Sequence, residues 1–583
     1  SLAVSAIPEG LPAVTAVALA AGLWRLARAG ALVRRLPAVE TLGATTVICS
    51  DKTGTMTENR MAVARVWLPG RVVEVGEPGT SRHGRFSERG RPIAPLEDSD
   101  LVRLLTVAAL VNDASVEAEG DGRRLHGDPT EAALLVAALE AGLDVTALSS
   151  AWPRRGEIPF SPVARLMATF HETPEGGHAV LVKGAPGAVL ERCERVHAAG
   201  TLRRVDDETR RRLLDDNRAL ANEGYRVLAV AWRDEAAPED RHIEDLTFLG
   251  FVALADPLRA GVKEALAQCR EAGIAIVMLT GDQRTTAEAI GRQLGLAADA
   301  IRSRVGPEDK LELIKALQAR GEVVAMTGDG VNDAPALVRA DIGIAMGRHG
   351  TDVAREAADV VLTDDNFATI VGAVQEGRVI YGNLKKVIRF LFSCNLSEIV
   401  AIFAAILAGF PSPLTPLQIL WVNVVTDILP AMALVRDPAE PDVMRRPPRD
   451  PGEALVTWRL GTRMLMEAAW LAAGVLSAYF WIVLQEGPGP RAHTVAFVAL
   501  VLIHPFQALH CRSERVFWWR LPPNRLVWAS MLALVAVQWL AVTWPPLAGL
   551  LGAVPLTAGD WLVTIVAVLW PVSLLEATKR WRG

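Results

Sequence analysis

The sequence predicts a multidomain membrane protein in which an α/β domain carries an inserted α+β domain and precedes a bundle of transmembrane helices. The chain has 583 residues, too many for one compact core, and its 51% hydrophobic content is too high for an ordinary soluble protein. Long apolar stretches are confined to the first 24 residues and to those after about 384. Between them, β-branched runs alternate with amphipathic stretches, which is typical of a parallel sheet with helices.

Six apolar stretches follow residue 384, and each approaches the roughly 20 residues that a helix needs to cross a bilayer. They are residues 386–409, 414–435, 460–484, 493–511, 526–547 and 559–577. We interpret residues 1–24 as the second half of another transmembrane helix, because Pro8, Glu9 and Pro12 do not suit a signal peptide. We therefore expect a fragment whose residues 381–583 form a six-helix transmembrane domain.

Basic residues mark alternate connections between these spans. They are Arg436, Arg445, Arg446, Arg449 and Arg459 in one loop, Arg512, Arg515, Arg520 and Arg525 in a second, and Lys579, Arg580 and Arg582 at the end. Because positive loops face the cytoplasm, these connections and the 25–380 block are expected there. The chain carries no organelle address, so a plasma membrane is the simplest location.

Composition excludes some classes of function. A formal net charge of -5 provides no basic field for nucleic acid. The five cysteines lack the spacing of a disulfide framework or of a thiolate metal site. They are Cys49, Cys193, Cys269, Cys394 and Cys511.

Three predicted strands of the α/β block end in a carboxylate. They are residues 45–50 before Asp51, residues 274–279 before Thr280-Gly281-Asp282, and residues 323–326 before Thr327-Gly328-Asp329. Ligands of open α/β sheets bind at the carboxyl ends of strands, so these groups can share one crevice. A single strand-end Asp-Gly pair is usually an ordinary turn, but three together favour a site.

Covalent phosphoryl transfer needs a carboxylate nucleophile, a Mg²⁺ ligand and a cation near the transferred oxygens. We assign Asp51 as the nucleophile and Asp329 as the Mg²⁺ ligand. The Asp51 carboxylate and the Thr53 carbonyl complete the predicted metal ligands, and Lys310 is the predicted charge stabiliser.

Residues 51–57 (Asp-Lys-Thr-Gly-Thr-Met-Thr), 327–337 and 280–282 resemble the motifs of P-type ATPases, and the resemblance extends over essentially the whole chain. It implies a haloacid-dehalogenase-like phosphorylation domain (25–60 and 251–380), with an ATP-binding domain (61–250) inserted. By resemblance, Thr280 and Gly281 would hold phosphoryl oxygens, and Asn332 and Asp333 would order the metal shell and the loop. The remaining catalytic candidates are Lys52, Asp282 and Arg304.

Thr53 occupies the position where phosphatases on this type of sheet have a second Asp, which acts as general acid and base. Without that Asp the aspartyl phosphate should be long-lived, as a pump requires.

Three segments of the inserted domain resemble the nucleotide-binding segments of the family: residues 127–131, 183–186 and 224–228. By resemblance Phe160 would stack on adenine, Glu131 would contact its edge, Lys183 would line the pocket and Arg226 would contact phosphates. An isolated Phe is more often a core residue, and only the neighbouring matches reverse this. Further candidates are Thr130, Arg165, Met167, Gly184 and Leu228.

Polar groups inside membrane spans are costly and are functional candidates. They are Glu9, Asn395, Glu398, Asn423, Thr426 and Asp427, together with backbone carbonyls of Val4, Ser5 and Ile7 freed by prolines. Such an oxygen cage suits Ca²⁺. Alternatives are a headgroup-facing helix end for Glu9 and interhelical hydrogen bonds for Glu398 and Asp427.

The same residues resemble Ca²⁺ pumps of sarcoplasmic-reticulum type. His504 falls where two-site calcium pumps have a glutamate, so one of the two Ca²⁺ sites lacks this ligand here. The alternatives for His504 are a role in proton counter-transport and simple packing between helices. A pump for Mn²⁺, Na⁺ or H⁺, and a phosphohydrolase or scaffold derived from a pump, remain alternatives. No Thr-Gly-Glu-Ser sequence occurs, so we expect the N-terminal helices and actuator domain to be missing and the fragment alone not to complete transport.

Overall fold

The computed structural model describes residues 10–76, 85–119, 122–198, 200–234, 242–450 and 452–581. Its contacts divide the chain into two units, which we describe separately. The first consists of Ser1–Ile48, Glu264–Ala275 and Leu311–Gly583, and the second of Cys49–Lys263 and Ile276–Lys310.

One sheet has seven strands in the order β1-β20-β19-β18-β2-β16-β17. In that order the strands are Ala31–Val33, Val360–Leu362, Ile342–Met346, Val324–Gly328, Val47–Asp51, Ala275–Thr280 and Ile301–Ser303. The pairs β16–β17, β18–β19 and β19–β20 are parallel, whereas β1 joins β20 antiparallel. Every residue of β18 and β19 is buried, as expected where both faces of a parallel sheet are covered. β2, β16 and β18 confirm the three strands predicted before the carboxylates.

Short helices connect these strands. They are α3 (Pro37–Ala44), α9 (Val262–Glu271), α10 (Arg284–Gln293), α11 (Pro307–Gln318), α12 (Ala334–Arg339) and α13 (Asp352–Ala357). The alternation of strands and helices confirms the predicted α/β class.

A second, largely antiparallel sheet is formed by the chain between β2 and β16. Its path is β6-β5-β4-β3-β15-β14-β11-β10-β9, with β12 beside β15 and β13 beside β12. In chain order its strands are Ala62–Leu68, Arg71–Val75, Phe86–Glu88, Arg91–Pro92, Arg154–Ile158, Leu166–Glu172, His178–Gly184, Cys193–Ala198, Thr201–Arg204, Arg226–Asp234 and Leu246–Ala255. β7 (Ser115–Glu119) and β8 (Gly122–His126) form a separate hairpin.

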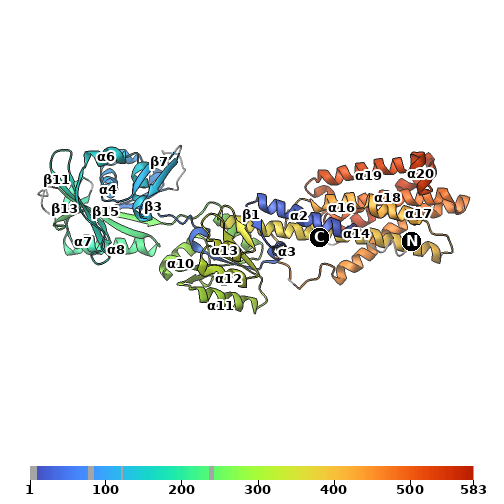
Figure 1. The fold of residues 1–583 in the computed structure, drawn as a ribbon, viewed down its shortest axis with the longest axis horizontal. Coiled ribbons are helices and arrows are strands. Elements are labelled where there is room, and N and C mark those ends of the chain that lie inside the picture. The colour runs from blue at the N-terminus through green and yellow to red at the C-terminus, as the bar shows by residue number, and fades with distance from the viewer. Residues whose placement is uncertain are drawn as a thin grey trace. The chain divides into compact units, whose positions relative to one another are not determined.

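Helices cover both faces of this second sheet, and two apolar cores result. α4 (Ser99–Leu110), α5 (Pro129–Glu140) and α6 (Val145–Ala151) lie on one face, and α7 (Pro186–Leu190) and α8 (Asp207–Asn222) on the other (Figure 1). Side chains of central β15 alternate between the cores: Val252 packs in the first, and Phe251 and Ala253 pack in the second. This period of two is the geometry of a strand.

Seven helices in the described part of the chain are long and apolar enough to cross a membrane. They are α2 (Leu11–Arg28), α14 (Phe367–Leu407), the α15–α16 segment (Pro416–Val435), α17 (Trp458–Glu486), α18 (Pro490–Cys511), α19 (Arg525–Thr543) and α21 with its 3₁₀ end (Ala558–Arg580). Six follow the α/β block, as predicted, and α14, α16, α17 and α18 run alongside one another (Figure 1). Residues 1–9 of the predicted first span lie outside the described residues.

α14 begins well before the span predicted at 386–409, because its first turns bury apolar residues such as Phe367, Ile370 and Val374. This early part packs against α3. The contact is tight at Gly377 and Gly43: a Cβ on Gly377 would lie 2.8 Å from the Gly43 nitrogen.

The predicted span at 414–435 is a broken helix. α15 (Pro416–Trp421) leads into a π-helical turn, Val422–Thr426, which is followed by α16 (Ile428–Val435). The Thr426 hydroxyl donates to the Val422 carbonyl at 2.8 Å. π-Helical turns are rare and are frequent at functional sites.

Gly377→Ala should destabilise the protein by about 1–3 kcal/mol, because the added methyl group meets backbone rather than a movable side chain. Thermal unfolding in detergent measures this. Gly372→Ala is the matched control on the same helix, since a Cβ there meets no atom within 4 Å. Equal unfolding temperatures for the two variants would contradict the tight contact.

Candidate catalytic and cation-binding sites

Asp51 ends β2, and the turn after it depends on Gly54. Residues Lys52–Met56 form one irregular turn in which Gly54 has φ +76°, a conformation that only glycine adopts without strain. Thr53 is extended within this turn, with φ −73° and ψ 129°. The turn directs the backbone sharply away immediately after the carboxylate.

Two residues that the sequence analysis missed hold this turn in place. The Arg259 guanidinium donates to the carbonyls of Gly54 at 3.0 Å and Thr57 at 2.9 Å. The Asp256 carboxylate accepts the Thr57 hydroxyl at 2.6 Å. Burial raises the pKa of Asp256, although hydrogen bonds from Thr57 and the Arg60 amide oppose the shift. Their signal was the pair of charged residues within four positions after the almost wholly buried strand β15.

Buried lysines neutralise two of the predicted carboxylates. Lys310 Nζ lies 2.6 Å from Asp51 Oδ2, and Lys52 Nζ lies 2.7 Å from Asp282 Oδ2. Lys310 comes from the first turns of α11. The structure thus brings the predicted nucleophile and charge stabiliser together.

The end of β16 and the loop to α10 carry Thr280, Gly281 and Asp282, and Arg304 directly follows β17. The Thr280 hydroxyl oxygen accepts a hydrogen bond from the Asp282 backbone amide, with an N···O distance of 3.1 Å. The Arg304 backbone amide donates a hydrogen bond to the Asp282 carbonyl, also at 3.1 Å. Gly281 faces open space, because a Cβ there would meet no atom within 4 Å. An open backbone of this kind can approach phosphate oxygens closely.

In the first unit, Asp333 shapes the loop that follows β18. Its carboxylate accepts hydrogen bonds from the backbone amides of Asp329 at 3.2 Å and Gly330 at 3.1 Å. Gly328 leaves room for it, since a Cβ there would lie 2.5 Å from the Asp333 Cβ. Asn332 lies in the same 3₁₀ turn. Asp329 belongs to a different unit from Asp51, so a Mg²⁺ site shared by the two stays a prediction.

Four of the predicted nucleotide residues form two polar pairs. Lys183 Nζ contacts Glu131 Oε1 at 2.7 Å, and Arg226 Nη1 donates to Thr130 Oγ1 at 3.1 Å. Thr130 and Glu131 start α5, which Asp128 caps, and Lys183 is near the end of β11. Burial lowers the pKa of Lys183, and its pairing with Glu131 opposes this shift.

The other nucleotide candidates differ in their surroundings. Phe160 is 61% exposed, so the alternative of a core phenylalanine is wrong. Met167 is buried opposite Lys183 in the β10–β11 register, and Leu228 packs against the core beneath α4 and α5. At Gly184 a Cβ would lie 2.5 Å from the Arg165 carbonyl, so Arg165 contributes its backbone here.

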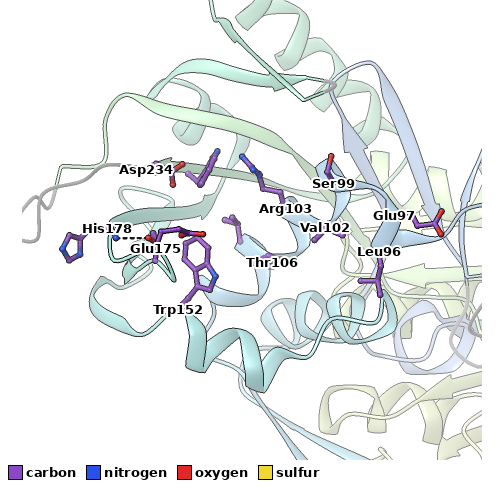
Figure 2. Close-up of a pocket in the computed structure, with 14 residues that line it drawn as sticks. Leu96, Glu97, Ser99, Val102, Arg103, Thr106, Trp152, Glu175, His178 and Asp234 are labelled. Carbon is purple, nitrogen blue, oxygen red and sulfur yellow. Dashed lines mark hydrogen bonds between the residues drawn. The ribbon is translucent and has the colours of Figure 1, made fainter.

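A cavity of about 820 Å³ lies at the other end of strand β11 (Figure 2). Its lining includes Trp152, Trp232, Arg103 and His178, and none of the predicted nucleotide residues. The Arg103 guanidinium lies over the Trp232 ring, with its Cζ atom 4.6 Å from the ring centroid. Size alone therefore does not locate the nucleotide site.

The predicted cation ligands that the structure describes are buried in the helix bundle. They are Asn395 and Glu398 on α14, Asn423 and Thr426 in the π-helical turn, and Asp427 directly after it. His504 Nδ1 on α18 lies 2.7 Å from Asp427 Oδ1, so Asp427 does form the interhelical hydrogen bond considered as an alternative. Val4, Ser5, Ile7 and Glu9 lie outside the described residues.

Several buried polar atoms of the bundle remain unsatisfied around this hydrogen bond. Asp427 Oδ2, His504 Nε2, Asn395 Nδ2 and both side-chain polar atoms of Asn423 have no hydrogen-bond partner among the described residues. A buried polar atom without a partner costs about 1–3 kcal/mol. Asp427 Oδ2, Asn423 Oδ1 and the ring nitrogen His504 Nε2 are the atoms of this set that can ligate a cation, and they gather in the centre of the bundle.

A second buried polar cluster was missed, although Arg389 and Glu467 fall within predicted spans and so met the criterion for functional candidates. Arg389 Nε donates to Glu467 Oε1 at 3.0 Å, and Gln507 Nε2 donates to Glu467 Oε2 at 3.0 Å. Arg463 Nε adds a contact to Glu467 at 3.2 Å. The cluster joins α14, α17 and α18, the helices that surround the cation ligands.

Two family models match the chain. One, described as "Cation transporting ATPase, C-terminus", covers residues 411–581, and the other, "P-type ATPase, cytoplasmic domain N", covers residues 100–261. The chain is 40% identical to a calcium-transporting ATPase of Bacillus subtilis, over 99% of this chain and 68% of the relative. It is also 40% identical to a probable cation-transporting ATPase F of Mycobacterium tuberculosis, with the same coverage. A bovine calcium-transporting ATPase type 2C member 1 is 38% identical, over 94% of this chain and 59% of the relative.

The protein belongs to the P-type cation-transporting ATPases. It is accordingly an integral membrane enzyme of the class that couples ATP hydrolysis to cation transport. ATP as substrate and Mg²⁺ as a requirement follow from the family.

Glu467→Ala should destabilise the protein by about 3–5 kcal/mol, because it leaves Arg389 buried without its partner. Thermal unfolding in detergent, monitored as the loss of monodisperse elution on heating, measures this change in stability. Glu486→Gln is the control: its side chain is 52% exposed, so it should change stability by about 1 kcal/mol or less. The double variant Arg389→Met with Glu467→Leu should recover most of the loss, since no unpaired charge remains. Failure of that recovery would contradict the ion-pair explanation.

Proposed function

We propose that this protein transfers the γ-phosphoryl group of ATP to Asp51 and uses the phosphorylated state to move Ca²⁺ across a membrane. The observation that carries the proposal is the 2.6 Å contact between the buried Lys310 ammonium and the Asp51 carboxylate at the end of a strand. This contact supports a nucleophile prepared for a highly charged substrate.

The chemical step is an in-line displacement. An Asp51 carboxylate oxygen attacks the γ-phosphorus, a new O–P bond forms, and the bond to the β–γ bridging oxygen breaks as ADP leaves with that electron pair. Lys310 stabilises negative charge on the transferred oxygens, because a fixed cation interacts strongly in a site shielded from water. The open backbone at Gly281 and the Thr280 hydroxyl are suited to bind the same oxygens.

The predicted metal ligands are all hard oxygen donors: the Asp51 and Asp329 carboxylates and the Thr53 carbonyl. Mg²⁺ prefers such ligands, so the donor set fits it. When bound, Mg²⁺ would neutralise charge on the phosphate oxygens. Asp333, by holding the amides of Asp329 and Gly330, would keep the Asp329 loop in one conformation.

The nucleotide is proposed to bind along the edge defined by Thr130, Glu131, Lys183 and Arg226. Phe160 has an accessible ring face for stacking on adenine. Arg226 and Lys183 supply positive charge, and Glu131 supplies an acceptor for the adenine amino group. The short side chain at Thr53, in place of a second acid, would delay hydrolysis of the aspartyl phosphate.

Ca²⁺ is proposed as the transported cation because relatives with about 40% identity are named calcium-transporting ATPases, and because the buried polar groups suit it. Carboxylate, amide and hydroxyl oxygens of Glu398, Asn423, Thr426 and Asp427 are ligands that Ca²⁺ prefers. The basic connections between spans support cytoplasmic catalytic domains, and we propose the plasma membrane as the location.

Asp51→Asn should abolish acid-stable labelling from ATP carrying a radioactive γ-phosphate, because an amide cannot form an acyl phosphate. In the unaltered protein, labelling should require Ca²⁺ at micromolar concentration. Asp299→Asn, in the short turn before β17, is a matched control that should leave labelling unchanged. Labelling that persists in Asp51→Asn would overturn the assignment of the nucleophile, and labelling indifferent to Ca²⁺ would overturn the choice of cation.

Lys183→Met should weaken ATP binding about 10-fold or more, because a charge-assisted hydrogen bond contributes about 1.5–3 kcal/mol. Equilibrium binding of a fluorescent nucleotide analogue to the purified protein measures this. Arg218→Met removes a cation from a side chain that is 73% exposed on α8, and it should not change the affinity. An unchanged affinity in Lys183→Met would place the nucleotide elsewhere.

A further inference from the structure

Three side chains with metal-binding atoms meet in the centre of the helix bundle. Cys394 of α14, Asp427 at the start of α16 and His504 of α18 place one ligand atom each within 4.8 Å of one another. All three are fully or almost fully buried, with exposed fractions of 0%, 1% and 0%. Their sequence separation shows no metal-ligand spacing, so the cluster arises only when the three helices pack.

The chemistry of this cluster differs from that of the oxygen ligands beside it. Ca²⁺ takes hard oxygen ligands, whereas a thiolate with an imidazole and a carboxylate is a set that favours borderline-soft ions such as Zn²⁺ or Co²⁺. Ligands of one Zn²⁺ lie about 3–4 Å apart, because each is about 2.0–2.3 Å from the ion. The three atoms lie within 4.8 Å of one another without an ion, and a bound ion would have to draw them closer to reach that range.

Orphaned polar atoms point to a ligand at the same place. Asp427 Oδ2 and His504 Nε2 have no hydrogen-bond partner within the described ranges, although both are buried. Cys394 could serve only as an apolar packing residue, since its neighbours include Val387, Phe390 and Leu391. That role would not explain why the carboxylate and imidazole beside it remain partly unsatisfied.

We propose that Cys394, Asp427 and His504 together bind a borderline-soft divalent cation at the proposed transport site. This inference rests on the proposed function, because it places such a cation where Asp427 would otherwise ligate Ca²⁺. Three protein ligands leave a tetrahedral ion with one open position, as in exchangeable rather than structural sites. The cation and Ca²⁺ therefore compete for Asp427. Binding of the ion to the sulfur releases the thiol proton to solvent.

Co²⁺ is the direct probe, because a thiolate bound to it produces a sulfur-to-metal charge-transfer absorption band that oxygen ligands do not. Titration of the purified full-length protein, in detergent and without ATP, should produce this band at one equivalent of Co²⁺. Zn²⁺ should then displace Co²⁺ and remove the band. Cys394→Ser should lack the band, and Cys511→Ser, a control that removes another buried thiol of the bundle, should retain it. His504→Gln should weaken Co²⁺ binding at least 10-fold, which tests the site independently if Cys394→Ser does not fold.

Competition provides the second measurement. Zn²⁺ should raise the Ca²⁺ concentration for half-maximal phosphorylation at least 10-fold in the unaltered protein and at most 2-fold in Cys394→Ser. The inference is overturned if the unaltered protein gives no charge-transfer band, or if the band survives in Cys394→Ser. If the band behaves as expected but Ca²⁺ never drives phosphorylation, the metal site stands and the proposal of Ca²⁺ as the transported cation fails.

Discussion

Several buried charged side chains in the described part of the chain are paired with a close partner of opposite charge. An ion that leaves water pays a large desolvation cost, which is recovered only by a close partner of opposite charge. Lys310 with Asp51, Lys52 with Asp282 and Lys183 with Glu131 meet this requirement in the soluble part of the chain. Arg389 with Glu467 meets it inside the helix bundle.

Buried polar groups that lack some of their hydrogen-bond partners are as informative as the paired charges. Asp427 has one oxygen bonded to His504 and one without a partner among the residues that the structure describes. Asn423, in the π-helical turn, has neither of its side-chain polar atoms satisfied within that part of the chain. Buried polar atoms of this kind require an explanation, and a bound ion that supplies the missing interactions is one. These groups lie in and directly after the π-helical turn of the broken helix, and the proposed cation site is placed there for that reason.

A close contact joins α14, which carries two of the proposed cation ligands, to the short helix α3. α14 is one continuous helix of 41 residues that packs on α3 at one end and carries Asn395 and Glu398 near the other. The close approach of Gly43 and Gly377 allows no side chain between the two helices.

The sequence by itself determined the class of the protein, the strand-end carboxylates and the number of apolar spans. These features are local: a phosphorylation motif occupies seven adjacent residues, and a span is a continuous run of apolar ones. The sequence also placed Asp51 and Lys310 in one site, although 259 positions separate them. Only the tertiary structure revealed that Arg259 and Asp256 hold the turn after Asp51, that Arg389 pairs with Glu467, and that Cys394 meets Asp427 and His504. These contacts join residues from different strands or helices, and their geometry depends on how the elements pack, which no local pattern of residues encodes.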